Sequence, residues 1–246
     1  MKIIEATWEK RNLGLTTYEI TIENTDTPDQ FREALKEVKS RGAQYIVVKT
    51  PVNLPDFLWT MSEDQFIFAE AQMQIYLKKD GYRPPQYLQT FDRHASYRLI
   101  QKEEEANQIL THYKNGVFET DRIYIDNYFE KNISGMRYFN WALDMYKKKE
   151  AYLYEFLLKD KPAGSFIMRP GKNNTMVSIL TTVNSDFVNK GIGLILFKKN
   201  ADAAFDSQYD AVEAAISSNN LQVLSVWMEL GSIIKNIQYV YIKHIQ

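Results

Sequence analysis

Two glycines stand directly before an apolar run with helical spacing in the stretch VNSDFVNKGIGLILFKKNADAAF, residues 183–205. Gly191 and Gly193 lack a Cβ, so a ligand can come close to the backbone there. A helix start adds unpaired N–H groups and the positive end of the helix dipole, and Lys190 adds a charge at its mouth. These features predict an anion site that suits a phosphate or pyrophosphate. The alternative is a glycine-rich helix start that binds nothing.

The common phosphate-binding motifs do not account for this stretch. A P-loop requires Gly-Lys-Ser/Thr at the end of its glycine-rich segment, and no such triplet follows Gly191. A dinucleotide-binding fingerprint requires a third glycine and a parallel βαβ context, whereas antiparallel strands are predicted before Val183. The elements around the loop must therefore indicate what it binds.

Alternation and helical spacing predict an α+β chain. The first part is predicted to form a small α/β layer, with strands at 2–7, 16–22, 43–50 and 66–78 and helices at 27–42 and 56–61. The second part is predicted to contain helices at 103–116, 134–149, 193–205 and 220–231 and strands at 151–158, 163–169, 175–183, 211–216 and 237–243. We therefore expect a mixed, mostly antiparallel sheet flanked by helices over residues 119–246. The smaller layer over residues 1–118 precedes it, with a boundary near Gly116.

The stretch ILTTVNSDFVNKGIGLILF resembles motif A of the GNAT superfamily, the acetyl-CoA-dependent N-acetyltransferases. In that family a strand leads through a short loop to Arg/Gln-x-x-Gly-x-Gly/Ala at a helix start, and the loop amides hold the pyrophosphate of coenzyme A. Residues 189–193 match the last five positions of this pattern. Val188 stands where Arg or Gln is usual, which removes one side-chain contact but leaves the backbone amides.

A second resemblance lies downstream, where SSNNLQVLSVWMELGS looks like the family's Asn-x-x-Ala-x-x-Leu-Tyr-x-x-Leu-Gly-Phe helix. Asn220 takes the Asn position, and Leu230 and Gly231 take the Leu-Gly positions. In the first half, four segments are similar to parts of TDP-amino-sugar N-acetyltransferases, such as TDP-fucosamine acetyltransferase. These segments are WEKRNLGL, YIVVKTP, FETDRIYIDNYF and RYFNWALDM. Those proteins place a partial GNAT-like layer before the complete GNAT domain.

The resemblance implies an acetyl-CoA-dependent N-acetyltransferase that acts on a small amine, including the option of a nucleotide-linked amino sugar. It implies no metal. The residues it assigns to coenzyme A are Thr182, Val183, Val188, Asn189, Lys190, Gly191, Ile192, Gly193 and Asn220. Two alternatives stay open: a non-catalytic ligand-binding or regulatory protein on the same fold, and a relative that uses an acyl carrier or a charged tRNA as donor.

The catalytic residues stay unassigned. The family's usual acid is a Tyr on the second helix, and here that position is Trp227, whose indole cannot donate a proton as a general acid. Tyr239 or Tyr241 could serve instead, or the thiolate could leave unassisted because a thiol pKa near 8.5 makes it a tolerable leaving group. For the proton acceptor, Glu213 could be a cleft carboxylate, although a Glu paired at the sheet face is the commoner situation.

Other charged residues indicate less. Asp186 in the loop is expected to be solvated, and Arg122 and Arg137 could pair with a diphosphate, although structural salt bridges are their commoner use. The three histidines have no metal-ligand spacing, and the absence of cysteine excludes disulfides and thiol catalysis.

Composition bounds the class of protein. Hydrophobic residues make up 45% of the 246, enough for a core, and the net charge of −1 argues against a nucleic-acid partner. The start MKIIEATWEK is not typical of a signal peptide, and no apolar run reaches the roughly 18–20 residues of a membrane span. We therefore expect a cytoplasmic protein without a membrane partner. The sequence leaves the oligomeric state open, a homodimer included.

Overall fold

The computed structural model describes residues 1–114 and 118–245. The strands are β1 (Lys2–Glu5), β2 (Thr17–Thr21), β3 (Tyr45–Pro51), β4 (Ile67–Lys78), β5 (Ala95–Leu99), β6 (Tyr152–Leu158), β7 (Lys161–Pro170), β8 (Thr175–Val183), β9 (Ala211–Ser217) and β10 (Ile233–His244). The α-helices are α1 (Thr7–Leu13), α2 (Pro28–Ser40), α3 (Pro55–Glu63), α4 (Leu88–Asp92), α5 (Glu103–Thr111), α6 (Arg122–Ile125), α7 (Asn132–Lys147), α8 (Gly193–Asp206) and α9 (Leu221–Glu229). Single 3₁₀ turns are η1 (Lys79–Gly81), η2 (His112–Lys114) and η3 (Ser185–Phe187).

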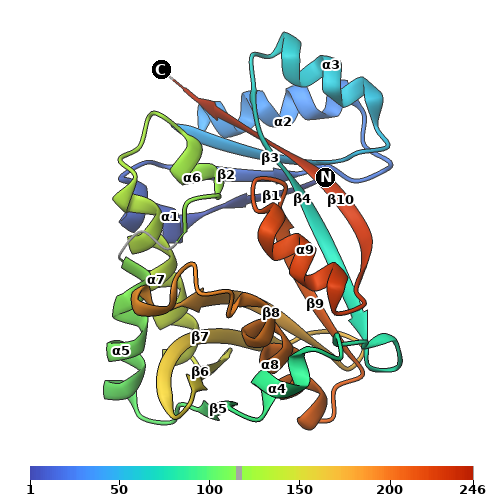
Figure 1. Ribbon diagram of the computed structural model, residues 1–246. Helices are drawn as coiled ribbons and strands as arrows, with labels where there is room; N and C mark the ends of the chain where they lie inside the picture. The colour runs from blue at the N-terminus through green and yellow to red at the C-terminus, as the bar shows by residue number, and fades with distance from the viewer. Residues whose placement is uncertain (115–117, 246) are drawn as a thin grey trace.

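The strands of the described residues form one ten-stranded sheet in the order β1-β2-β3-β10-β4-β9-β8-β7-β6-β5. Its two longest members, β4 and β10, are antiparallel neighbours that cross the middle of the molecule side by side (Figure 1). β10 also pairs with β3 from the first part of the chain, and β4 pairs with β9 from the last part. Each part of the chain therefore contributes a strand that pairs with a strand of the other part, and these pairings join the two parts in one sheet.

The same order of elements occurs twice along the chain. The first repeat is β2-α2-β3-α3-β4 and the second is β8-α8-β9-α9-β10, and in each the first two strands are parallel neighbours. The third, fourth and fifth elements have equal lengths of 7, 9 and 12 residues in both repeats. The repeat was not visible in the sequence, because backbone geometry rather than side-chain identity carries it.

The core lies on both faces of the sheet. On one face, α2 and α3 cover a cluster around Phe31 and Phe57, and α8 and α9 cover a cluster around Leu196 and Trp227. On the other face, α5 and α7 cover a cluster around Leu153, and α6 with the start of α7 covers another that includes Tyr45, Ile123 and Val240. The middle of the second face, between these covers, keeps exposed positions such as Gln74 on β4.

Local sequence signals explain where α2 begins. Thr27 and Gln30 form a capping box at the start of α2, and Pro28 occupies the first helical position, which explains why the predicted helix begins there. The expected mixed, mostly antiparallel sheet flanked by helices is confirmed. The helices α1 and α6 and the edge strand β5 were not predicted. The helix end predicted at Gly116 lies outside the described residues, and the division at residue 118 stays a prediction.

Among the helices of the described residues, none combines the length and apolar character required to cross a membrane.

Candidate functional site

The parallel neighbours β8 and β9 pair only over their first halves. Their register runs from Thr175 opposite Ala211 to Ser178 opposite Ala214. Beyond these positions β8 continues to pair with β7 and β9 with β4, but residues 179–183 and 215–217 are not paired with each other. The strands therefore part toward their carboxyl ends, and their facing edges keep unpaired backbone groups. We call this feature the β8–β9 opening.

The loop of residues 184–192 leads from the β8–β9 opening into α8. Two of its residues, Asn189 (φ 61°) and Gly191 (φ 71°), have left-handed backbone, which brings the chain around to the helix start. Among the described residues, no side chain caps α8: its N-cap residue Ile192 makes no side-chain hydrogen bond, so the first amides of the helix lack a capping partner there. A Cβ added at Gly193 would meet no atom within 4 Å. The helix start therefore offers free N–H groups and open space.

The corresponding place in the first repeat is closed. There β2 and β3 pair along all five residues of β2, and the Ile22 N–H then donates to the Lys49 carbonyl at 2.8 Å. The start of α2 is capped by Thr27 and Gln30, and Pro28 removes one donor. Of the two equivalent helix starts, that of α2 is capped by side chains and has lost one donor, whereas that of α8 has neither a side-chain cap nor a proline among the described residues.

Most of the residues assigned to coenzyme A meet at this loop. Asn189, Lys190 and Gly191 are exposed, and the Lys190 ammonium lies 5.4 Å from the centroid of the Phe187 ring. Val188 is 48% exposed, in agreement with a position on the loop surface rather than in the core. Ile192 and Gly193 form the helix start itself.

Three further predicted residues lie on the strands and on α9. Thr182 is 5% exposed, and its hydroxyl points into the sheet, 3.1 Å from the Ser165 hydroxyl, so only its backbone can face the β8–β9 opening. Val183 ends β8 opposite Gly164. The side chain of Asn220 caps α9 by accepting a hydrogen bond from the Val223 N–H at 3.2 Å. The binding roles of these residues stay predictions.

The aromatic candidates lie in two core clusters, and the cluster of Trp227 also includes Ile192 at the start of α8. Trp227 is 1% exposed and packs edge-on against Phe197, with ring centroids 5.4 Å apart, so it is a core residue. Tyr239 and Tyr241 belong to the cluster under α2 and α3, where both rings contact Phe68. Both tyrosines therefore pack on the face of the sheet that α2 and α3 cover, and a role for either as an acid stays a prediction.

The carboxylate and arginine candidates are found in the paired, solvated or salt-bridged positions that are commoner for such residues. Glu213 is paired with Lys235 at 3.2 Å on the sheet surface, and Asp186 is exposed. Arg122 and Arg137 form salt bridges inside the protein. Within the residues that the structure describes, no group of His, Asp and Glu could hold a metal ion.

A buried ion cluster around Glu9 was not foreseen. Glu9 of α1 is fully buried, and it accepts hydrogen bonds from Arg122 Nη2 at 3.2 Å and from Arg137 Nε at 2.7 Å. Arg122 also donates to Glu19 at 3.1 Å, and Arg137 lies 3.6 Å from Asp121. The cluster joins α1 and β2 to α6 and α7, and so fixes the segment that follows residue 118.

The electrostatics of this cluster follow from burial and pairing. Burial lowers the pKa of the Arg122 guanidinium, but Glu19 and Glu9 outweigh burial and raise it overall. Burial would raise the pKa of Glu19, yet Arg122 and Lys49 lower it overall. Arg122 and Glu19 are therefore both charged at neutral pH. Sequence reasoning could not pair them, because Glu9 and Arg137 are 128 residues apart.

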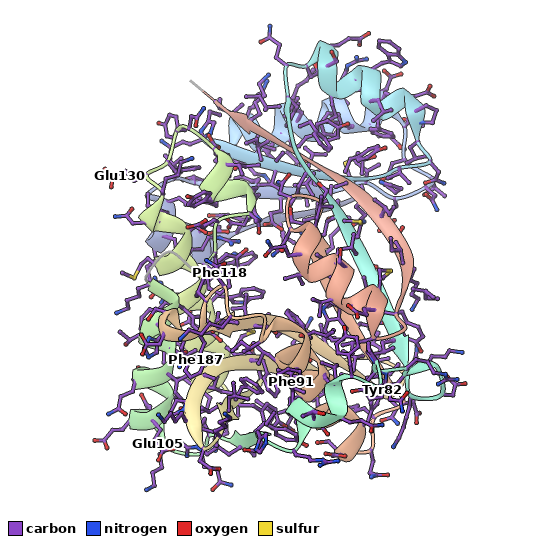
Figure 2. All side chains as sticks on the ribbon, viewed as in Figure 1. Tyr82, Phe91, Glu105, Phe118, Glu130 and Phe187 are labelled. Carbon is purple, nitrogen blue, oxygen red and sulfur yellow. The ribbon has the colours of Figure 1, made fainter. Side chains whose placement is uncertain are left out.

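The segment that follows residue 118 reaches over the end of β9. Phe118 lies beside α7, with its ring centroid 4.2 Å from that of Tyr138 (Figure 2). The Thr120 carbonyl accepts hydrogen bonds from the Ser217 hydroxyl at 3.2 Å and from the Asn219 amide at 3.4 Å. This segment therefore forms one wall next to the carboxyl end of β9.

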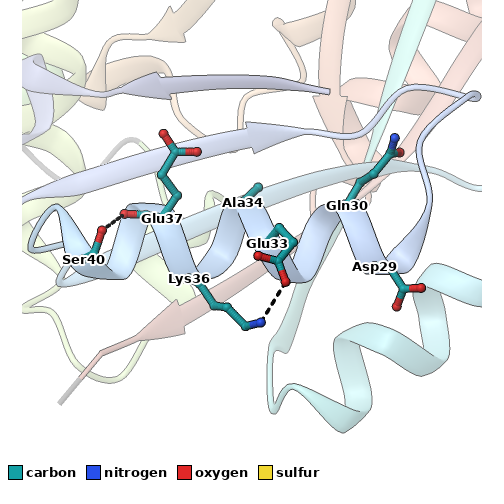
Figure 3. A pocket seen from close by; sticks show the side chains of 7 residues that line it. All are labelled: Asp29, Gln30, Glu33, Ala34, Lys36, Glu37 and Ser40. Carbon is teal, nitrogen blue, oxygen red and sulfur yellow. Dashed lines mark hydrogen bonds and ion pairs between the residues drawn. The ribbon is translucent and has the colours of Figure 1, made fainter.

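A hollow elsewhere on the surface lacks these features. It follows the outer side of α2, where charged side chains such as Asp29, Glu33, Lys36 and Glu37 line it (Figure 3). All of its lining residues come from this one helix, so nothing encloses a ligand there. The candidate site therefore remains the β8–β9 opening and the start of α8.

No family model and no curated protein matches this sequence. Solved structures match its fold. A GCN5-related N-acetyltransferase from Sphaerobacter thermophilus superposes with a TM-score of 0.62 at 11% identity, over 100% of this chain and 76% of that one. A tandem GNAT protein from the clavulanic acid biosynthesis pathway gives 0.58 at 13% identity, over 94% and 76%. A conserved protein of unknown function from Staphylococcus epidermidis gives 0.62 at 14% identity, over 94% and 85%.

These likenesses establish that the chain has the fold of the GNAT N-acetyltransferases. At such low identity these likenesses do not indicate a substrate for this chain. What the protein does must therefore be argued from the site.

Proposed function

We propose that this protein is an N-acetyltransferase that moves the acetyl group of acetyl-CoA to a small amine. The observation that carries the proposal is the uncapped, glycine-bordered start of α8 at the mouth of the β8–β9 opening. An anion-binding helix start next to an opening between strands suits a ligand with a pyrophosphate at one end and an extended arm.

The residues present fit coenzyme A. Its pyrophosphate would accept hydrogen bonds from the amides at Gly193 and beyond, with Lys190 as an added positive charge. Its pantetheine arm carries amide groups, and these would pair with the unpaired backbone edges of β8 and β9 as an extra strand does. The closed counterpart in the first repeat implies one coenzyme per chain.

Acetyl transfer requires a neutral amine and a hydrogen-bond donor for the thioester oxygen as negative charge develops on it. Free backbone N–H groups on the β8 edge near Val183 would supply that donor. The thiolate can leave without an acid, since its ordinary pKa is near 8.5. This agrees with the burial of Trp227 at the position of the family's usual tyrosine.

The acceptor we favour is an amino sugar, including nucleotide-linked forms. The resemblance of the first half of the chain to TDP-amino-sugar acetyltransferases supports this choice. Mass spectrometry of the product from a panel of amines would identify the acceptor.

Turnover is measured by the release of the coenzyme A thiol. Because the chain contains no cysteine, a thiol reagent reports the product alone. We expect thiol release that depends on both acetyl-CoA and an amine. Binding of acetyl-CoA without turnover of any amine would contradict the enzymatic proposal and favour a non-catalytic ligand-binding protein.

A further inference from the structure

One buried carboxylate near the β8–β9 opening comes from the first repeat. Glu70 lies on β4, is 5% exposed, and stands opposite Val240 of β10. The register between these strands shifts at this point, so that Ala69 has no partner on β10. Such a bulge re-aims the neighbouring side chains and is frequent beside active sites.

The position of Glu70 relative to the site follows from the sheet register. Gln72, two residues along β4, is opposite Ser217, the last residue of β9. Alternation places Glu70 on the same face as Gln72, diagonally next to Ser217. β9 is one of the two strands that border the β8–β9 opening. Glu70 therefore lies one strand away from the place where the thioester would lie.

The charged groups around Glu70 are engaged with other residues. Lys49 of β3 pairs with Glu19 at 3.7 Å, and Arg122 pairs with Glu9 and Glu19. Asp121 is a further negative group nearby, and it pairs with Arg137. Over residues 1–114 and 118–245, no cation forms an ion pair with Glu70.

A carboxylate in such a place is poised to take up a proton. Burial raises the pKa of Glu70, and the Ser217 hydroxyl and Arg122 offset only part of this effect. A base with a raised pKa is matched to proton transfer near neutral pH.

The neighbouring strip of sheet is polar and only partly covered. Gln72 faces Gln238 of β10 across the strand pair, and one step further along β4 Gln74 is exposed. Alternation places all three amides on the face that carries Glu70. Carboxamides donate and accept hydrogen bonds, so this strip suits a ligand rich in hydroxyl groups.

We propose that Glu70 accepts a proton from the amine of the acceptor, and that Gln72, Gln74 and Gln238 bind hydroxyl groups on the same molecule. This rests on the proposed acetyl transfer. The ammonium of the acceptor gives one proton to Glu70 and becomes a neutral amine. The lone pair of that amine forms the C–N bond to the thioester carbonyl carbon, and the C–S bond breaks. The nitrogen passes its second proton to the leaving thiolate, and Glu70 releases its proton to water. The first repeat thus completes the site of the second through its β4 strand.

The test compares Glu70→Gln with Glu213→Gln, a matched control that removes a half-buried, paired carboxylate from the adjacent strand on the same face. The acceptors are glucosamine and cyclohexylamine, a ring amine of similar size without hydroxyls. We expect wild type to favour glucosamine at least about tenfold in kcat/KM. Glu70→Gln should lower kcat by about 100-fold and remove the acidic limb of its pH profile, with the affinity for acetyl-CoA unchanged. The control should behave as wild type.

Each part can fail separately. Retention of kcat and of the pH profile in Glu70→Gln would overturn its role as base, and equal or no use of the two amines would overturn the hydroxyl preference. Absence of acetyl-CoA binding in wild type would instead refute the proposed function.

Thermal unfolding gives an independent reading that needs no turnover. Because the pKa of Glu70 is raised in the folded state, the protein loses stability as the pH rises from about 4.5 through that pKa. Gln cannot ionise, so Glu70→Gln should raise the Tm by about 2–4 °C at pH 8 and by less at pH 5. A lower Tm at pH 8 would show that the charged carboxylate is held by a structural partner, and would overturn the proposal.

Discussion

Gly193→Asp is expected to weaken acetyl-CoA binding by about 10- to 100-fold while leaving the fold as stable as wild type or slightly more stable. Gly193 is the first residue of α8, and a Cβ there meets no atom within 4 Å, so the substitution creates no clash. A carboxylate at a helix start interacts favourably with the dipole, by about 0.3–1 kcal/mol. The same carboxylate repels a pyrophosphate at about 4 Å by roughly 1–4 kcal/mol.

Calorimetry and thermal unfolding measure the two effects of Gly193→Asp separately. The matched control is Pro28→Asp, which introduces the same charge at the first position of α2 in the other repeat. The control should leave acetyl-CoA affinity unchanged, because that helix start is capped and lies at a closed strand pair. Unchanged affinity in Gly193→Asp would show that the coenzyme does not lie at the start of α8.

Arg122→Met is expected to destabilise the protein by about 3–5 kcal/mol, which lowers the Tm by roughly 10 °C. Arg122 is 8% exposed and is shared between Glu9 and Glu19, so its removal leaves carboxylates buried without their partner. The control is Lys36→Met on α2, which removes an ion pair to Glu33 whose side chains are both 74% exposed (Figure 3). That change should cost no more than about 1 kcal/mol.

The pH dependence of this effect has a defined sign. The pKa of Glu19 is lowered in the folded state, so its contribution to stability is present above its ordinary value of 4.5 and is lost as the pH falls through the lowered pKa. The difference between wild type and Arg122→Met should therefore shrink in acid. Urea unfolding at pH 7 and pH 3.5 measures it. A loss below about 1 kcal/mol at pH 7 would contradict a structural role for the cluster.

The sequence predicted the elements whose signals are local. Thr27 and Pro28 mark the start of α2, and the turns between β6, β7 and β8 follow from short polar stretches. The helix start after Gly191 was found because glycine spacing before an apolar run is also a local signal. The sequence likewise favoured a Glu213 paired at the sheet face, and the structure pairs it with Lys235.

Features that depend on distant parts of the chain could not be predicted in this way. The position of β10 between β3 and β4 leaves no trace in either strand's own pattern. Glu70, Gln72 and Gln74 do alternate along β4, but the same pattern describes a strand with one solvated face. Only the register with β9 places these side chains next to the β8–β9 opening. The Glu9 cluster likewise needs four separate elements to meet.

Isothermal titration with acetyl-CoA tests the central claim most directly. The claim is that the second repeat holds one coenzyme at the β8–β9 opening and that the first repeat holds none. We predict saturable binding with one molecule per chain. No heat of binding at millimolar acetyl-CoA, or two molecules bound per chain, would contradict it.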